Sequence, residues 1–272
     1  MTENQSTAAS GADSGSNPLL TLKGFSKSFG PVEALKEVDF EVYPGEVVGL
    51  VGDNGAGKST LIKAISGAQP PDTGQAWWDG QAVRINTPHD ATALGIATVY
   101  QDLALAENLD VVANLFLGQE IANTIPGVKV LDETAMEKKS VELLGSLGVT
   151  TLRSVRTEVA SLSGGQRQAV AIARSLLGEP KMVVLDEPTA ALGIVQTEQI
   201  LKLVGRLRDR GLGVIMISHN LADVFEVSDR IAVLRLGRMT ATFKASEASN
   251  EQIVASITGA DVRERSTEET PL

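Results

Sequence analysis

The sequence EVVGLVGDNGAGKSTLIKAIS spans Glu46 to Ser66 and organises the chain around it. The apolar run Val47 to Val51 predicts a buried strand, and apolar residues recur at helical spacing after Lys58. Between them lies a match to G-x-x-x-x-G-K-[ST], made of Gly52, Asp53, Asn54, Gly55, Ala56, Gly57, Lys58 and Ser59, with Thr60 next. The stretch therefore predicts a strand, a phosphate-binding loop and a helix.

The chemistry of this loop favours a nucleoside triphosphate, either ATP or GTP. Successive backbone N–H groups of such a loop point inward, and glycine lets the backbone approach a phosphate closely. The positive end of the helix dipole faces the same anion. Lys58 adds a charge for the β- and γ-phosphates, and the Ser59 hydroxyl is a ligand for Mg²⁺. The alternative is an ordinary glycine-rich turn between a strand and a helix.

Composition limits the classes of protein that this chain can be. It has 272 residues, 43% of them hydrophobic, which is enough for a substantial core. No apolar run approaches the roughly 20 residues of a membrane-spanning helix. The net charge of −10 argues against nucleic acid as a main partner, and the absence of cysteine excludes disulfides. Residues 1–18 resemble no secretory signal and are expected to form a disordered leader, so the protein is expected to stay inside the cell.

Short apolar and alternating runs at residues 19–25 and 38–42 predict an N-terminal layer of β-strands. Phe29 lies in the expected loop between them, where it is either a core residue or a ring that stacks on a purine. Residues 76–85 predict a hairpin around an Asp-Gly turn. Its adjacent tryptophans, Trp77 and Trp78, face opposite ways in a strand, so we assign them no function.

The rest of the chain alternates in character. Residues 88–94 predict a short helix between Thr87 and Gly95, and residues 96–100 a strand that stops at Gln101. From about residue 102 to 178 helical periodicity dominates, which predicts a helical insertion. Strands and helices then alternate up to residue 234, as in a mostly parallel sheet with helices on both faces. We expect one domain over residues 19–259 and a polar tail over 260–272.

Two carboxylates follow the apolar strand that ends at Leu185. The carboxyl ends of parallel strands form the ligand crevice, so Asp186 and Glu187 are expected beside the phosphate loop. Asp186 is the natural partner of Mg²⁺, and Glu187 could polarise a water in line with the γ-phosphate. The alternative for either acid alone is capping of the next helix. His219 also follows a strand, where it could donate to the γ-phosphate or be an ordinary loop histidine.

A second anion-binding element is predicted at Leu162 to Gln166, LSGGQ. Ser163 is a good N-cap, and Gly164 and Gly165 leave the N–H groups of the following helix uncovered. A flexible helix start is the alternative, and the residues alone leave both open.

The phosphate loop, Gln101, LSGGQ, Asp186-Glu187 and His219, in this order, resemble the nucleotide-binding domain of ABC transporters. LSGGQ is the hallmark of that family, and the resemblance covers about residues 19–258. It implies an α/β fold with a P-loop NTPase core, a mostly parallel sheet, an N-terminal antiparallel β-layer and a helical subdomain, together with a Mg²⁺-dependent ATPase activity coupled to transport.

The resemblance also implies a role for each matched residue. Phe29 corresponds to the aromatic that stacks on adenine, and Gln101 to the residue that contacts Mg²⁺ and relays the nucleotide state to a permease. Glu187 corresponds to the catalytic carboxylate and His219 to the switch histidine. The residues Ser163, Gly164, Gly165 and Gln166 would complete the ATP site of a second copy of the chain in a head-to-tail dimer.

One position departs from the family pattern. After Pro188-Thr189-Ala190-Ala191-Leu192 the family usually has aspartate, and this chain has Gly193, which puts communication between the two ATP sites in question. The stretches DATALGIATVYQDLAL, NLDVVANLFLG and TAALG are similar to the ATPases of bacterial monosaccharide importers of the ribose, xylose and fructose type. Many of those carry two such domains, whereas no internal repeat of the motifs is found here.

We therefore expect the ATP-hydrolysing subunit of a bacterial sugar importer, peripheral on the cytoplasmic face of the membrane. Its expected partners are a second copy of itself, the permease subunits and, indirectly, a sugar-binding protein. The alternatives are an ATP-gated interaction switch without meaningful hydrolysis and a non-transport ABC ATPase acting on ribosomes or DNA.

Overall fold

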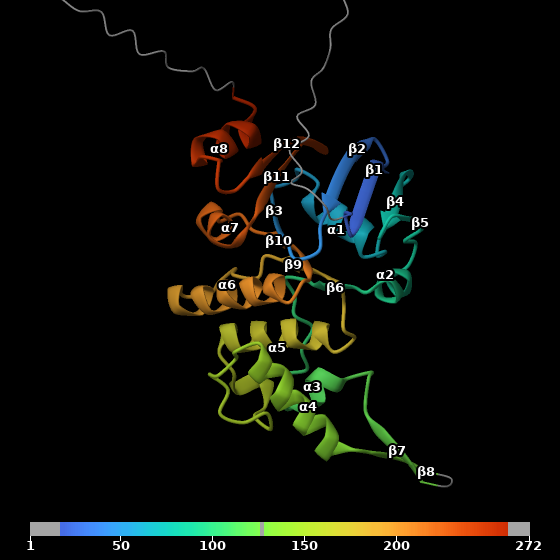
Figure 1. Cartoon of the computed structure of the whole chain (residues 1–272), viewed down its shortest axis with the longest axis vertical. Helices are drawn as coiled ribbons and strands as arrows, with labels where there is room; N and C mark the ends of the chain where they lie inside the picture. The colour runs from blue at the N-terminus through green and yellow to red at the C-terminus, as the bar shows by residue number, and fades with distance from the viewer. Residues whose placement is uncertain (1–16, 126–127, 261–272) are drawn as a thin grey trace, which may run out of the picture.

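The computed structural model describes residues 17–125 and 128–260, which form three connected layers in Figure 1. An antiparallel sheet and a mostly parallel sheet lie in the upper half of the view, and a mainly helical part lies below them. Most of the leader expected at residues 1–18, and the tail expected at 260–272 apart from its first residue, fall outside the described residues. Within the described ranges, no helix combines the length and apolar character needed to cross a membrane.

The N-terminal antiparallel layer is present as predicted. Its strand order is β2-β1-β4-β5, with bounds β1 Leu20–Phe29, β2 Val32–Val42, β4 Thr73–Trp78 and β5 Gln81–Val83. Of the two tryptophans, Trp78 is buried and Trp77 is half-buried. The loop placement of Phe29 was wrong: it is the last residue of β1 and pairs with Val32 across a tight turn. The strands run further than predicted because backbone pairing continues through polar residues at the hairpin end.

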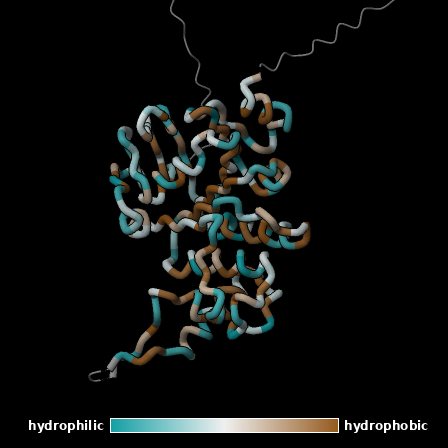
Figure 2. The backbone as a smooth tube through the Cα atoms, turned by 180° about the vertical axis from the view of Figure 1, so that it is seen from behind, coloured by the Kyte–Doolittle hydropathy of each residue, from teal (hydrophilic) through white to brown (hydrophobic). Residues whose placement is uncertain are grey.

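The main sheet has the order β12-β11-β3-β10-β9-β6, and all its pairs are parallel except β11 with β12. The strands are β3 Val47–Val51, β6 Ile96–Val99, β9 Met182–Asp186, β10 Gly213–Ile217, β11 Arg230–Arg235 and β12 Arg238–Lys244. Successive side chains of β3 enter two different cores, Val47 and Val51 on one face and Val48 and Leu50 on the other. Since both faces are covered, the central strands are continuously apolar, as Figure 2 shows.

Helices pack against both faces of this sheet. On one side α1 (Lys58–Ile65) buries Leu61, Ile62 and Ile65 in the core shared with the antiparallel layer. On the other, α6 (Ile194–Asp209), α7 (Leu221–Val227) and α8 (Asn250–Thr258) contribute to the second core. The short helix α2 (Pro88–Leu94) has the predicted Thr87 cap and a left-handed Gly95 at its end.

The insertion between β6 and β9 is helical, as predicted, with α3 Val111–Phe116, α4 Glu133–Ser146, a short 3₁₀ turn at Val159–Ser161 and α5 Gly164–Leu176. It also contains a hairpin that the sequence analysis missed, β7 (Ala122–Ile125) with β8 (Val128–Leu131), which projects from the lower end of the molecule in Figure 1. These strands are only four residues long and carry no sustained alternation, so periodicity gave no signal for them.

Candidate nucleotide-binding site

Four neighbouring parallel strands end at one edge of the main sheet and carry the predicted site residues there. In register, Ile217 of β10 lies between Leu50 of β3 and Asp186 of β9, and Val99 of β6 pairs with Leu185. The phosphate loop, His219, Glu187 and Gln101 follow directly after these strands. The parallel topology therefore brings together residues that are as far apart in sequence as Gly52 and His219.

The phosphate loop needs glycine for reasons beyond access to a phosphate. Gly52 has φ +152°, and a Cβ added to it would lie 2.1 Å from the carbonyl oxygen of Leu234 in β11. Gly57 caps α1 with φ +109°, and its added Cβ would lie 2.6 Å from the carbonyl oxygen of Ala34 in β2. Backbone atoms of both sheets lie so close to the loop that only glycine fits at these two positions.

Lys58, the first residue of α1, lies within the loop that precedes it. Its Nζ donates to the carbonyl oxygens of Gly52 (2.5 Å) and Asp53 (3.0 Å). Burial lowers the pKa of Lys58, and the carboxylates of Glu187, Asp53 and Asp186 act in the opposite direction. The lysine ammonium is therefore within electrostatic range of both acids of the predicted pair.

Asp186 is the last residue of β9 and is half-buried. Burial raises the pKa of its carboxyl group, the negative charge of Glu187 raises it further, and Lys58 and Lys63 lower it. A desolvated carboxylate next to a second one favours a bound cation, and Asp186, the Ser59 hydroxyl and the Gln101 amide are hard oxygen donors that could hold Mg²⁺. In the described part of the chain, no cluster of three or more histidine, cysteine or acidic side chains could hold a metal ion.

Glu187 and His219 form a direct pair. His219 Nδ1 lies 2.8 Å from Glu187 Oε2, and the His219 backbone N–H donates to the same oxygen at 3.4 Å. The glutamate side chain is only 16% exposed, whereas the histidine side chain is 73% exposed. His219 thus holds the largely buried Glu187 carboxylate in place, while most of the imidazole ring is exposed and accessible to a ligand.

Gln101 is exposed where the chain leaves β6, and the segment that follows it is held by side chains that the sequence analysis did not single out. Asn114, fully buried in α3, donates to the carbonyls of Ala106, Leu109 and Asp110 and accepts from the Ala106 N–H. Arg174 of α5 donates to the carbonyl oxygens of Ala104 (2.8 Å) and Leu103 (2.9 Å). In the sequence, Asn114 and Arg174 differ from their neighbours only in being polar residues near the apolar positions of a helix.

The LSGGQ segment lies on the helical part and begins α5. The Ser163 hydroxyl accepts from the Gln166 N–H, and the Gln166 side-chain oxygen accepts from the Ser163 N–H, which is a reciprocal cap. Gln166 also donates to the Thr151 carbonyl at 2.8 Å, so its side chain is engaged within its own subunit. Ser163 and Gly164 are exposed, and among the described residues no hydrogen bond joins this segment to the phosphate loop.

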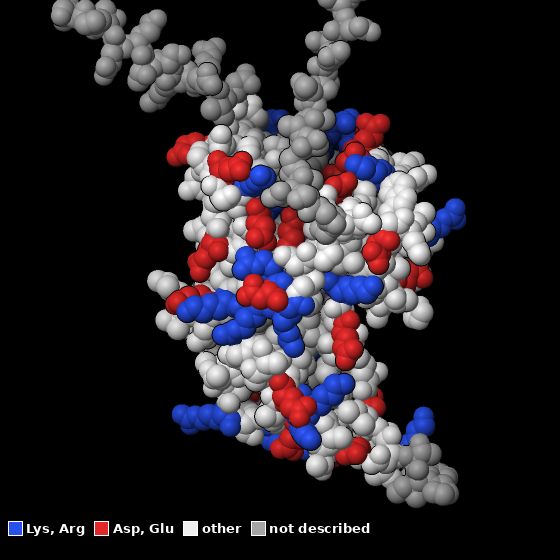
Figure 3. Space-filling view, in the orientation of Figure 1, with Lys and Arg blue, Asp and Glu red and all other residues white. Residues whose placement is uncertain are grey.

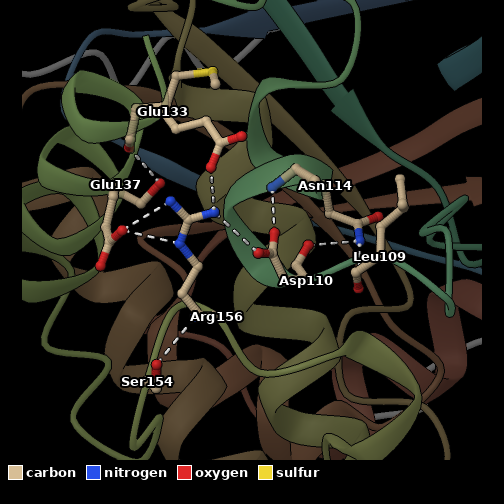
Figure 4. A network of polar contacts seen from close by, with 10 residues as sticks. Leu109, Asp110, Asn114, Glu133, Glu137, Ser154 and Arg156 are labelled. Carbon is tan, nitrogen blue, oxygen red and sulfur yellow. Dashed lines mark hydrogen bonds and ion pairs between the residues drawn. The ribbon is translucent and has the colours of Figure 1, made fainter. Parts of the chain in front are cut away.

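The chain that leads to Ser163 is held by a charged cluster, shown in Figure 4. Arg156 is surrounded by Glu137 (2.8 Å), Glu133 (3.3 Å) and Asp110 (3.4 Å), which come from α4 and from the N-cap of α3. Backbone bonds from Val111 to the Thr157 carbonyl and from Val112 to the Val155 carbonyl continue the same attachment. The approach to Ser163 is thereby fixed to the segment that follows Gln101.

The remaining predicted residues surround the loop. Asp53, Asn54, Gly55 and Ser59 are exposed, Thr60 is partly exposed, and Ala56 is buried. Phe29 exposes 44% of its surface, with the Lys27 ammonium 5.8 Å from the centre of its ring. A core role for this ring is therefore excluded, and stacking on a purine stays a prediction.

Gly193 caps α6 with an extended backbone that any residue could adopt. A Cβ added there would approach only the side-chain oxygen of Gln196, at 2.6 Å. The Gln196 side chain also covers Gly165, whose added Cβ would lie 2.8 Å from the Gln196 Cβ. The space that an aspartate side chain would need at this position is therefore filled by Gln196.

Comparison with known proteins agrees with this geometry. The family model described as ABC transporter matches residues 35–190, which is more than half of the chain. The fructose import ATP-binding protein FrcA of Rhizobium meliloti is 45% identical over 248 residues, covering 89% of this chain and 95% of that protein. The xylose/arabinose import ATP-binding protein XylG of Sulfolobus acidocaldarius is 46% identical over 240 residues, covering 88% and 94%.

Longer relatives match over part of their length. The ribose import ATP-binding protein RbsA 1 of Rubrobacter xylanophilus is 42% identical across 91% of this chain but only 48% of its own length. Among solved structures, the ADP conformation of the ATP-binding cassette MJ1267 has a TM-score of 0.74 at 27% identity, covering 90% of this chain and 96% of that one. A dimeric post-hydrolysis state of the cassette MJ0796, bound to ADP and Pi, has a TM-score of 0.68 at 27% identity, covering 83% and 98%.

The α/β fold with its helical insertion, the ordered motifs and these similarities lead to one conclusion: the chain belongs to the ABC transporter family, as an ATP-binding cassette.

Proposed function

We propose that this chain binds ATP with Mg²⁺, hydrolyses it as a head-to-tail dimer and thereby energises import of a monosaccharide through a membrane permease. The main support is the sheet edge at which Lys58, Asp186, Glu187 and His219 meet, while the Ser163 segment is exposed on a separate part of the molecule. The import proteins to which the chain is similar are named for fructose, xylose/arabinose and ribose.

The phosphate loop and its neighbours bind the nucleotide. In this proposal Phe29 stacks on the adenine, and the N–H groups of residues 52–60 surround the phosphates. Lys58 exchanges its carbonyl contacts for the β- and γ-phosphates, a stronger, charge-assisted interaction. Ser59, Gln101 and Asp186 hold Mg²⁺, which, when bound, neutralises charge on the β- and γ-phosphate oxygens.

Glu187 accepts a proton from the attacking water, and His219 senses the γ-phosphate. A neutral imidazole has one N–H, so His219 can donate either to Glu187 or to the γ-phosphate. It can donate to both only as an imidazolium. The 2.8 Å pair therefore links the position of the carboxylate to the presence of the γ-phosphate.

A second copy of the chain completes each site. Ser163 and Gly164, exposed at the start of α5, would present N–H groups to the ATP held by the other copy. Closure would then depend on the γ-phosphate, and loss of that group by hydrolysis would open the dimer. The dimeric MJ0796 structure, a similar cassette, supports this arrangement.

The permease would bind at the helical part, placing the protein on the cytoplasmic face of the membrane. A groove of about 430 Å³ lies where the helical insertion meets the main sheet, lined among others by Tyr100, Leu103, Leu117 and Arg174. Tyr100 and Leu117 are large apolar side chains that remain exposed, at 38% and 52%. The sugar would contact the permease and a separate binding protein, so no residue of this chain is expected to specify it.

The decisive experiment is Glu187→Gln. We expect this variant to bind ATP, to release phosphate about 10²- to 10⁴-fold more slowly, and to form a stable dimer with ATP and Mg²⁺. Phosphate release and gel filtration with light scattering measure the two effects. Glu198→Gln is the matched control, because Glu198 is an exposed residue of α6 whose partner is Lys202. Wild-type turnover by Glu187→Gln would remove the glutamate from this role.

Two other functions remain as alternatives. An ATP-gated switch without hydrolysis is suggested only by Gly193, and measuring phosphate release from the protein with its permease tests it. A non-transport ATPase acting on ribosomes or DNA is disfavoured by the net charge of −10. Basic side chains do gather across the middle of the face shown in Figure 3, but acidic ones lie among them.

A further inference from the structure

Behind the Glu187–His219 pair lies a buried carboxylate that none of the motifs includes. Asp223 of α7 accepts from the Thr189 hydroxyl through Oδ2 (2.7 Å) and from the Asn220 side-chain amide through Oδ1 (2.8 Å). Thr189 follows Glu187 by two residues, and Asn220 follows His219 directly. One carboxylate therefore joins the two loops that carry the pair.

Asp223 lies in the first turn of α7, where the helix dipole favours its negative charge and burial opposes it. Asp223 is 7% exposed and Thr189 8% exposed, and among the described residues Asp223 has no cationic partner within salt-bridge distance. The desolvation of a buried carboxylate offsets much of what its hydrogen bonds contribute. Its two neutral donors satisfy both oxygens, and both donors lie on the loops of the site. The hydrogen bonds of Asp223 therefore fix the positions of the loops that contain Thr189 and Asn220.

The loop after β9 needs such support because its backbone is strained. Glu187 has φ +52°, a left-handed conformation that non-glycine residues avoid. Strain of this kind persists only where surrounding contacts enforce it. The Glu187 N–H is tied to the Ile217 carbonyl at 3.0 Å, and the Glu187 carbonyl accepts from Ala190 at 3.1 Å. Thr189, held by Asp223, is the side chain that fixes the turn to α7.

We propose that Asp223 is a positioning residue for ATP hydrolysis, which holds Thr189 and Asn220 so that the Glu187 carboxylate and the His219 imidazole stay in contact. This inference rests on the proposed role of Glu187 as the base. In this proposal Asp223, which is buried, acts through Thr189 and Asn220 and has no contact of its own with the nucleotide. Misplacing a catalytic group by about 1 Å lowers rates on the order of a hundredfold, so loss of the network lowers turnover and leaves ATP binding to the phosphate loop intact.

The test uses Thr189→Val, which removes the hydroxyl while nearly preserving volume, and Asp223→Asn, which replaces one acceptor oxygen by a donor. In the full-length protein we expect each variant to lower kcat for phosphate release by about tenfold to a hundredfold, with ATP affinity changed less than about twofold. Thr189→Ser, which keeps the hydroxyl, restores turnover. The double variant is no slower than the slower single variant, because both changes break the same bond.

Ser140→Ala is the control for lost stability. Ser140 is a fully buried hydroxyl that donates to the Met136 carbonyl within α4, far from the sheet edge. It is expected to lower the Tm about as much as Thr189→Val does without lowering kcat. Wild-type turnover in Asp223→Asn and Thr189→Val, additive effects in the double variant, or no restoration by Thr189→Ser would each overturn the inference.

Glu187→Gln separates this inference from the proposed function. If Glu187→Gln keeps wild-type turnover, the proposed base is wrong. If it loses turnover while Thr189→Val and Asp223→Asn do not, only the role of Asp223 is wrong. In the Glu187→Gln background, Thr189→Val is expected to have no further effect on turnover, since the carboxylate that it positions is already absent.

Discussion

At the scale of single residues, the site contains charged side chains, Asp186 and Lys58, whose burial lowers the stability of the folded protein. Asp186 is half-buried beside Glu187, and both effects raise the pKa of its carboxyl group. Lys58 is half-buried too, and burial lowers its pKa. These pKa shifts mean that the folded protein destabilises the charged forms of both side chains when no ligand is bound. We infer that these charged groups lower the stability of the folded protein, and that the proposed triphosphate and cation would offset this cost.

Asp186→Asn should therefore stabilise the unliganded protein. With a folded pKa above that of the unfolded chain, about 3.9, the aspartate favours folding when protonated, and this advantage is lost as pH rises through the folded pKa. Asparagine has no charge to desolvate, so we expect a Tm higher by about 1–4 °C near pH 7, with the gain shrinking toward pH 4. Thermal unfolding across this range measures it.

Asp209→Asn, at the exposed end of α6, is the control and should change stability by no more than about 0.5 kcal/mol. A lower Tm for Asp186→Asn at pH 7 would contradict the inferred cost.

At the scale of elements, side chains replace regular hydrogen bonding in the segment after Gln101. Residues 103–110 belong to no helix or strand, yet Asn114, Arg174 and backbone bonds from Val159 and Ala160 hold them in place. Arg156 attaches the same region to α4. The loop that would face the permease and the chain that leads to Ser163 are thus parts of one connected structure. A displacement at one is expected to reach the other.

Asn114→Ala tests how firmly this loop is held. The change removes the partner of the part-buried Ala106 N–H, whereas the Ala106 carbonyl keeps the Leu109 N–H as a donor, and an unsatisfied buried group costs about 1–3 kcal/mol. We expect a loss of about 2–3 kcal/mol in unfolding free energy and faster hydrogen exchange of the Ala106 amide.

Asn108→Ala, on the exposed part of the same loop, is the matched control and should be nearly neutral. Equal protection of the Ala106 amide in Asn114→Ala and wild type would mean that the loop is held by other contacts.

At the scale of the whole molecule, the two proposed halves of an ATP site lie on different parts of one chain. The phosphate loop is at the edge of the main sheet, and the Ser163 segment heads a helix of the insertion. Next to it, Ile194 and Val195 at the start of α6 expose 90% and 65% of their surfaces. These apolar side chains continue the surface that the proposed second copy would cover.

Mixing two inactive variants tests this arrangement. Lys58→Ala disables the phosphate loop, and Ser163→Arg blocks the exposed segment with a large cation. In a head-to-tail dimer a mixed pair contains one intact site, so an equal mixture should recover about a quarter of wild-type turnover. Phosphate release from each variant alone and from the mixture measures this.

Each variant must still fold, which its Tm reports. A mixture as inactive as its components would mean that Lys58 and Ser163 act within one chain.

Much of the fold and of the site was predictable because its signals are local. The phosphate loop combines a short apolar strand, glycines and a helix start within about 20 residues, and the strands that end at Asp186 and before His219 are continuous apolar runs. The Thr87 and Ser163 caps were likewise readable, since a cap involves residues only three positions apart. The β7–β8 hairpin and the strand position of Phe29 were not, because strands of four residues and the ends of a hairpin are too short for a sustained alternation.

The sequence by itself determined where the phosphate-loop motif lies, which strands would be buried and which family the chain resembles. Only the tertiary structure decided that Asp223 joins the loops after Glu187 and His219, that Gln196 fills the space beside Gly193, and that Asn114 and Arg174 hold the loop after Gln101. These contacts depend on the pairing of strands and the packing of helices that are distant along the chain. A local sequence pattern reflects only the secondary structure of its own segment. Which distant side chain a residue contacts is decided when the sheet and its helices pack together.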